Sequence, residues 1–149
     1  MSHRFVQYAQ SVNVQRIRME VKYETKEKFT VVTPNETHLS ANMTEELTYS
    51  CSQYLEQQTK NVVLNLQEVN SLDDEAASSI TSLQQNFYER NASFVVCGMS
   101  KELEQKFDEL ELLDFLNFTP TESEAWDIVQ MEEIERELLD SDDITFESE

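Results

Sequence analysis

The chain has 149 residues, enough for one compact domain, and its apolar fraction of 39% can supply a core. Its formal net charge of −19 argues against nucleic acid and anionic membranes as primary partners, because like charges repel. The single glycine, Gly98, excludes phosphate-binding loops and dinucleotide fingerprints, since both need several glycines where the backbone approaches phosphates.

The cysteines and histidines show no zinc-binding pattern. Cys51 and Cys97 lie far apart without a CxxC spacing, and only His3 and His38 could join them. Two lone cysteines fit a reducing compartment, where both are expected to be small core residues. No apolar run approaches ~20 residues, and the first residues show no secretion signal, so we expect a cytoplasmic protein without a cofactor.

The chain begins with a basic segment. Residues 1–18 contain three arginines and no acid, which gives this segment a charge of +3. We expect a flexible basic extension here, with Met19 either the translation start or the edge of the folded domain. The folded domain is predicted to span residues 19–139.

The first half of the domain predicts a hairpin, a helix and a buried strand. Residues 20–25 alternate apolar and polar side chains, as in an edge strand, and residues 29–33 are its β-branched partner. Apolar residues at helical spacing predict a helix within residues 39–58. The short apolar run 61–66 reads as a buried strand.

The second half continues the alternation. Asp73 is expected to cap a helix, followed by a buried strand at 93–97, a short helix to residue 107 and a strand at 113–118. Thr121 and Glu124 form a capping box for the last helix, on which Trp126 and Met131 are expected to pack in the core. Residues 121–149 hold 12 acids and one arginine, and we predict an acidic, disordered tail at 140–149.

This order of elements predicts an α/β fold. We expect a mixed sheet of about five strands, with parallel central strands and an antiparallel N-terminal hairpin at the edge, flanked by about four helices. In such sheets, sites lie beyond the carboxyl ends of the strands, where helix N-termini point. The segment 69–76 occupies that place.

Three consecutive acids, Asp73, Asp74 and Glu75, stand in this segment. Acids at a helix start are favoured by the helix dipole, so capping alone could explain them. Alternatively, the three carboxylates could bind a divalent metal or belong to an enzyme. No basic residue lies within the next dozen positions to tune them, and His38 is expected to be a solvated loop residue.

The run from Asn61 to Ala77, NVVLNLQEVNSLDDEAA, resembles the central signature of STAS domains, the anti-sigma factor antagonists. That signature is an apolar strand, a Leu-x-x-Val turn, an apolar residue and Asp-Ser-Ser-Gly-Leu. The segments 94–98 and 112–121 resemble the next strand with its glycine and the entry to the last helix. The resemblance extends from about Val21 to Leu138.

The resemblance implies a non-enzymatic, partner-switching regulator of transcription. An unphosphorylated antagonist of this family binds an anti-sigma factor, usually a kinase, and phosphorylation of the first serine of the motif ends the complex. Phosphate adds roughly two negative charges at a helix start on the docking face. The implied partner is therefore an anti-sigma factor, a kinase-like protein or a related regulator, while self-association into a homodimer stays open.

This sequence departs from the family motif at the phosphorylated position. Asp73 matches the family aspartate, whereas Asp74 stands at the phosphoacceptor serine, Glu75 at the second serine and Ala76 at the glycine. We therefore expect a locked, non-phosphorylatable switch whose partner-binding loop and helix start comprise residues 73–77, Ala77 included. In a third interpretation, the protein is a structural relative whose acidic loop binds nothing.

Overall fold

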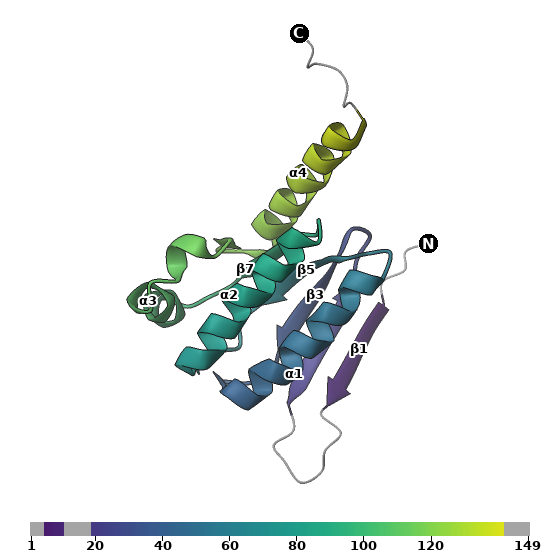
Figure 1. Cartoon of the computed structure of the whole chain (residues 1–149). Helices are drawn as coiled ribbons and strands as arrows, with labels where there is room; N and C mark the ends of the chain where they lie inside the picture. The colour runs from purple at the N-terminus through teal and green to yellow at the C-terminus, as the bar shows by residue number, and fades with distance from the viewer. Residues whose placement is uncertain (1–4, 11–18, 142–149) are drawn as a thin grey trace.

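A computed structural model describes residues 5–10 and 19–141. Within these residues, six strands form one sheet in the order β1-β2-β3-β5-β7-β8, with helices on both faces (Figure 1). The strands of this sheet are β1 (Phe5–Gln10), β2 (Glu20–Thr25), β3 (Phe29–Pro34), β5 (Asn61–Asn65), β7 (Phe94–Cys97) and β8 (Phe118–Thr119). The helices are α1 (Ala41–Ser52), α2 (Asp74–Glu89), α3 (Lys101–Glu109) and α4 (Glu122–Ser141), with short 3-10 turns η1 (Gln53–Glu56) and η2 (Leu113–Phe115).

The central strands are buried on both faces, and their side chains alternate between two cores. In β5, Val62 and Leu64 join the core beneath α1 and α2, whereas Val63 faces α4 on the other side. The same alternation separates Phe94 from Val95 in β7. β3, β5, β7 and β8 pair in parallel, which confirms the predicted α/β fold with a parallel centre. Cys51 and Cys97 are fully buried, as expected.

The antiparallel hairpin is confirmed, but the prediction of a flexible extension before Met19 is wrong for residues 5–10. These residues form β1, which pairs antiparallel with β2 from Phe5 opposite Thr25 to Gln10 opposite Glu20. β2 is therefore an inner strand, and β1 is the edge. The three arginines of residues 1–18 all lie outside this stretch, and pairing with β2 explains why residues 5–10 form a strand. Residues 1–4 and 11–18 lie outside the described part.

The strand predicted at 113–118 is also wrong in its first half. Residues 113–115 form the turn η2, and β8 comprises only Phe118 and Thr119. The apolar spacing suggested a strand, yet Phe115 projects into solvent with 66% of its surface exposed. Glu111, with φ of 62°, reverses the chain after α3 and directs it into this turn.

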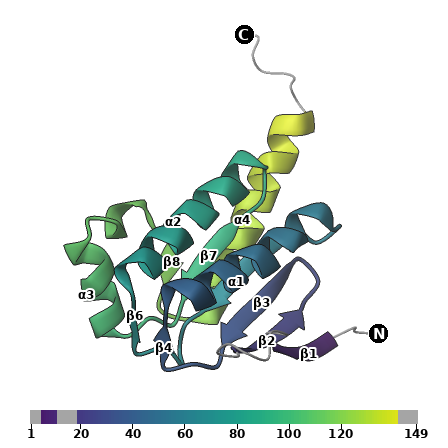
Figure 2. The same ribbon diagram turned by 60° about the horizontal axis from the view of Figure 1, so that its bottom comes forward.

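A small second sheet, which the sequence did not predict, joins the loop before α1 to the loop before α2. β4 (His38–Leu39) pairs in parallel with β6 (Ser71–Leu72). The helix expected within 39–58 consequently starts later, at Ala41, and gives way to η1 after Ser52. This pairing places the loop before α1 beside the loop before α2, and α1 lies alongside α2 on one face of the main sheet (Figures 1 and 2).

Gly98 follows β7 in the left-handed region, with φ of 79°. A Cβ atom at this position would lie 2.8 Å from Oδ1 of Asn65. Asn65 is the last residue of β5 and pairs with Cys97, the residue before Gly98. The same Asn65 oxygen accepts a hydrogen bond from the Gln67 N–H at 3.0 Å. The single glycine of the chain therefore stands where both the backbone angle and the space require one.

Helix α4 covers the opposite face of the sheet. Thr121 caps it, as predicted, through a 3.2 Å bond from the Glu124 N–H to its hydroxyl. Ala125 and Val129 are fully buried against the sheet, but the second half of the helix extends beyond it (Figure 1). No helix in the described part of the chain is long and apolar enough to cross a membrane. The predicted tail lies outside the described residues from position 142 onward, although the helix itself continues to Ser141.

Candidate functional site at the start of helix α2

Asp73 connects the starts of two helices. It stands at the N-cap of α2 with extended backbone angles, but its side chain makes no capping bond to its own helix. Its Oδ2 instead accepts the N–H of Ala41, the first residue of α1, at 2.9 Å. Its Oδ1 lies 3.1 Å from Nε2 of His38. The capping expected from the sequence is therefore corrected: the carboxylate caps the neighbouring helix, because the β4–β6 pairing brings that helix within reach.

His38 is exposed, as expected, yet it is held in place. Its Nδ1 lies 2.7 Å from the Ser71 hydroxyl, while its Nε2 faces Asp73. The Ala41 N–H and the His38 ring both favour the charged carboxylate and lower the pKa of Asp73 below its ordinary value of 3.8. Asp73 thus remains an anion at neutral pH, where it ties β4 and the start of α1 to the start of α2.

Asp74 forms an ion pair that the sequence did not indicate. Its Oδ1 lies 2.6 Å from Nζ of Lys106, which projects from α3. The hydrogen bond that Lys106 donates to this carboxylate raises the pKa of Lys106. About two thirds of the Asp74 side chain is exposed, so the charge remains accessible at the surface while one of its oxygens is engaged.

The remaining predicted site residues divide into surface and core. Glu75 is exposed in the first turn of α2, beside Asp74. Ala76 and Ala77 are fully buried against the main core. The two alanines therefore shape the helix start from beneath, and the surface there is formed by Asp74, Glu75 and the exposed Ser78 in the next turn.

Two shallow grooves flank this helix start. One, of about 360 Å³, separates β6 from α3 and includes Ser71 and Lys106 in its lining. The other, of about 370 Å³, runs between α1 and α2. Five of the eight residues that line the second groove are serine or threonine; the lining comprises Glu45, Thr48, Ser52, Ser78, Ser79, Ser82, Leu83 and Asn86.

The geometry gives the metal alternative no support. The Asp73 carboxylate is turned toward His38 and Ala41, whereas that of Asp74 is turned toward Lys106. Across residues 5–10 and 19–141, no group of three or more His, Cys, Asp or Glu side chains is arranged to hold a metal ion.

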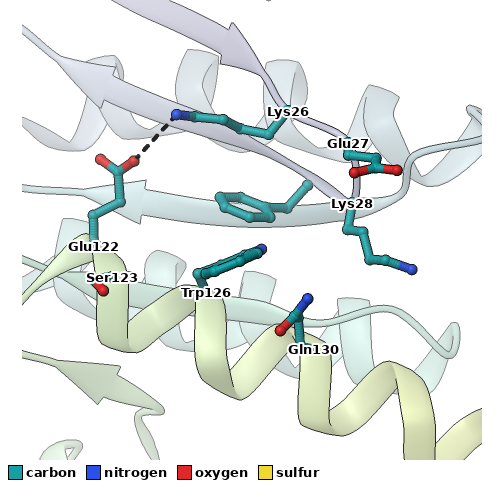
Figure 3. A pocket seen from close by; sticks show the side chains of 8 residues that line it. Lys26, Glu27, Lys28, Glu122, Ser123, Trp126 and Gln130 are labelled. Atoms are coloured by element: carbon teal, nitrogen blue, oxygen red, sulfur yellow. Dashed lines mark ion pairs between the residues drawn. The ribbon is translucent and has the colours of Figure 1, made fainter. Parts of the chain in front are cut away.

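A separate pocket of about 410 Å³ lies between the β2–β3 turn and α4 (Figure 3). Trp126 lines it with 43% of its surface exposed, so the expected core packing of this residue is wrong. Lys26 forms an ion pair with Glu122 at 3.9 Å, which joins two residues of the pocket lining (Figure 3), and a second one with Glu24 of β2 at 3.5 Å. The pocket belongs to the α4 face of the sheet, away from the start of α2.

The sequence therefore located the acidic helix start but missed the residues that hold it. His38 and Lys106 lie 35 and 32 positions from the acids they contact, in a loop and in another helix. No local spacing predicts such contacts, because they depend on how β4 pairs with β6 and on where α3 packs.

Solved structures of anti-sigma factor antagonists share this fold. A STAS domain protein from Planctomyces limnophilus is similar with a TM-score of 0.64 and 14% identity, over 74% of this chain and 97% of that one. The antagonist SpoIIAA in its unphosphorylated form gives 0.61 and 13%, over 74% and 96%. The phosphorylated form of the Bacillus cell fate determinant SpoIIAA gives 0.55 and 15%, over 73% and 98%.

No curated protein matches this sequence. The pattern of one protein family does match it, over residues 20–125, and that family is the STAS domain. The matched range begins at β2 and ends in the first turn of α4, so it includes the acidic start of α2 and both helices beside it. By sequence and by fold, this chain belongs to the STAS domain family.

Proposed function

We propose that this protein is a non-enzymatic regulatory module that binds a protein partner through the start of α2, in the manner of an anti-sigma factor antagonist. The observation that carries the proposal is the pair of exposed carboxylates, Asp74 and Glu75, at a helix start where the family motif places a phosphorylated serine. SpoIIAA, one of the structural neighbours, is known in unphosphorylated and phosphorylated forms.

The proposed switch is fixed in one charge state. Two adjacent carboxylates approach the charge that a phosphate would add, and neither can be removed by a phosphatase. The Asp74–Lys106 ion pair at 2.6 Å holds one of them at a defined place. Asp73 holds the start of α2 in place, because its carboxylate accepts the first N–H of α1 while its backbone begins α2. The partner is an anti-sigma factor, a kinase-like protein or a related regulator.

Restoring the family motif tests this proposal. The double variant Asp74→Ser/Ala76→Gly should change the affinity for the partner at least about tenfold, because it removes the fixed charge and supplies a hydroxyl. Binding is measured by calorimetry against a panel of anti-sigma factor kinases. Glu102→Ser is the matched control, since it removes an exposed acid from the first turn of α3. Equal affinities of wild type and the double variant would contradict the locked switch.

Phosphorylation provides an independent readout. Incubation with the same kinases and ATP should leave the segment 73–79 of the wild type unmodified, whereas the double variant should gain phosphate at position 74. Peptide mass spectrometry distinguishes position 74 from the native hydroxyls of Ser78 and Ser79. Phosphate on the wild-type segment would show that the switch is not locked.

A further inference from the structure

The outer surface of α4 carries an apolar stripe where a solvated helix normally carries charged side chains. Met131, Ile134 and Leu138 are 54%, 56% and 63% exposed. Spacings of three and four residues place the three side chains on one face of the helix. Met131 was expected to fill a gap in the core, and the structure corrects this.

This stripe points away from the sheet. Val129 is fully buried, and Leu138 follows it by nine residues, which is two and a half turns at about 3.6 residues per turn. The two side chains therefore lie on opposite sides of the helix. The core already uses one face of α4, so the described residues leave the stripe exposed.

The second half of α4 is accessible along its length. Residues 137–140 are all exposed, and the helix extends past the sheet and the neighbouring helices (Figures 1 and 2). A polar network anchors its middle: Glu132 accepts hydrogen bonds from Tyr88 and Ser93, while Asn61 donates to Glu133 at 2.6 Å. The protruding helix is thus fixed to the body, and the stripe is presented in a defined direction.

The acidic side chains that border the stripe favour a partner of opposite charge. Asp127 and Glu135 are exposed next to it, and the helix as a whole carries eight acids against one base, Arg136, for a formal charge of −7. A second copy of α4 would bring the same charge to the contact and be repelled. A helix whose apolar seam is bordered by lysine or arginine would instead form complementary ion pairs.

We propose that the stripe of Met131, Ile134 and Leu138 binds an amphipathic, basic helix of a partner protein. This surface is separate from the start of α2, and the inference does not depend on the locked switch. The stripe covers few residues compared with the roughly 20 residues a side of a stable interface. It therefore acts as one segment of a larger or transient complex.

A synthetic peptide tests the inference on the full-length protein. The probe is a labelled helix of about three heptads with leucine at a and d and lysine at e and g. Its binding is followed by fluorescence anisotropy. We expect saturable binding that weakens as NaCl rises from about 50 to about 300 mM, because salt screens the ion pairs. A matched peptide with glutamate at e and g should not bind.

Matched variants locate the binding. Ile134→Ser/Leu138→Ser should lower the affinity at least about tenfold. Tyr49→Ser/Phe115→Ser should leave it unchanged, because it removes two apolar side chains of similar exposure, 70% and 66%, elsewhere on the surface. Circular dichroism verifies that both variants keep their helix content, as expected for exposed positions.

Four results would overturn the inference. The lysine peptide could fail to bind, or bind both double variants equally, which would place the contact elsewhere. The glutamate peptide could bind as well as the lysine peptide, which would remove the argument from charge. Finally, sedimentation could show a homodimer that Ile134→Ser/Leu138→Ser dissociates, in which case a second copy covers the stripe.

Discussion

Asp73 illustrates how one carboxylate can join two elements. Its oxygens accept the first N–H of α1 and contact His38, while its backbone begins α2. A helix start carries partial positive charge, so an anion between two such starts is stabilised by both. Asp73 is therefore a structural anchor, whereas the two acids that follow it, Asp74 and Glu75, face solvent.

Asp73→Asn should lower the melting temperature at pH 7, because it removes the charged acceptor of the Ala41 N–H. Since the folded pKa of Asp73 lies below its ordinary 3.8, its stabilisation is complete above that pH and is lost as the pH falls through the folded pKa. The difference between variant and wild type should thus shrink toward pH 2.5. Thermal unfolding at several pH values measures it.

Glu75→Gln serves as the control for Asp73→Asn, since it removes an exposed acid two positions away. We expect its effect on melting temperature to be much smaller than that of Asp73→Asn. A gap between Asp73→Asn and wild type that stays constant down to pH 2.5 would show that the charge of Asp73 contributes no stability.

Gly98→Ala should destabilise the fold by about 1–3 kcal/mol. The substitution forces a positive φ on a residue with a side chain and places its Cβ against Asn65. Gly98→Asn separates the two causes, because asparagine tolerates this backbone region but still carries a Cβ. Urea unfolding should show both variants weakened, with asparagine less affected; a Gly98→Ala variant as stable as wild type would contradict the steric account.

At the scale of elements, α4 is joined to the sheet by polar contacts as well as apolar ones. Asn61, at the start of β5, is 2% exposed and fully engaged. Its amide donates to the Lys28 carbonyl and to Glu133, and its carbonyl accepts the Ser93 N–H at 2.8 Å. One side chain therefore links the residues just before β3 and β7 to α4, at the same end of the sheet.

Asn61→Leu should lower the free energy of unfolding by about 3 kcal/mol, because the Ser93 N–H and the Lys28 carbonyl lose their hydrogen-bond partner. The matched control is Asn42→Leu, an exposed position in α1. It should shift the stability by less than about 0.5 kcal/mol. Chemical denaturation measures both, and an equal effect of the two substitutions would refute the anchoring role of Asn61.

At the scale of the whole molecule, the charge of −19 opposes the compact state. Screening of this self-repulsion predicts that the melting temperature rises as NaCl is increased from about 10 to about 300 mM. Choline chloride at equal ionic strength should give the same rise, because the effect needs no specific ion. A melting temperature that is flat or falls with salt would show that local ion pairs outweigh the net repulsion.

Magnesium extends this experiment to the metal alternative. At matched ionic strength, Mg²⁺ should raise the melting temperature no more than NaCl does, since Asp73 and Asp74 are turned toward different partners. A ligand selective for the native state would stabilise it by mass action. An excess stabilisation by Mg²⁺ that Asp74→Asn/Glu75→Gln abolishes would revive a metal-binding function.

The sequence alone determined the fold class and the position of the acidic helix start. Runs such as 61–66 and 93–97 are apolar enough to be buried strands, and hydrophobic periodicity and capping residues define most helices between them. Gly98 and the three acids are local features, so they could be read directly. The family resemblance depended on the same local runs, and the match over residues 20–125 confirms it.

Only the tertiary structure decided which surfaces these elements present. β1 exists because β2 offers it a partner, although its own segment looked like an extension. Lys106 meets Asp74, and Asp73 caps α1, because distant segments are brought together by sheet pairing. The α4 stripe is exposed because the sheet occupies only the opposite side of that helix. Apolar periodicity shows that a helix has a hydrophobic face, but contacts across the fold determine whether that face is buried.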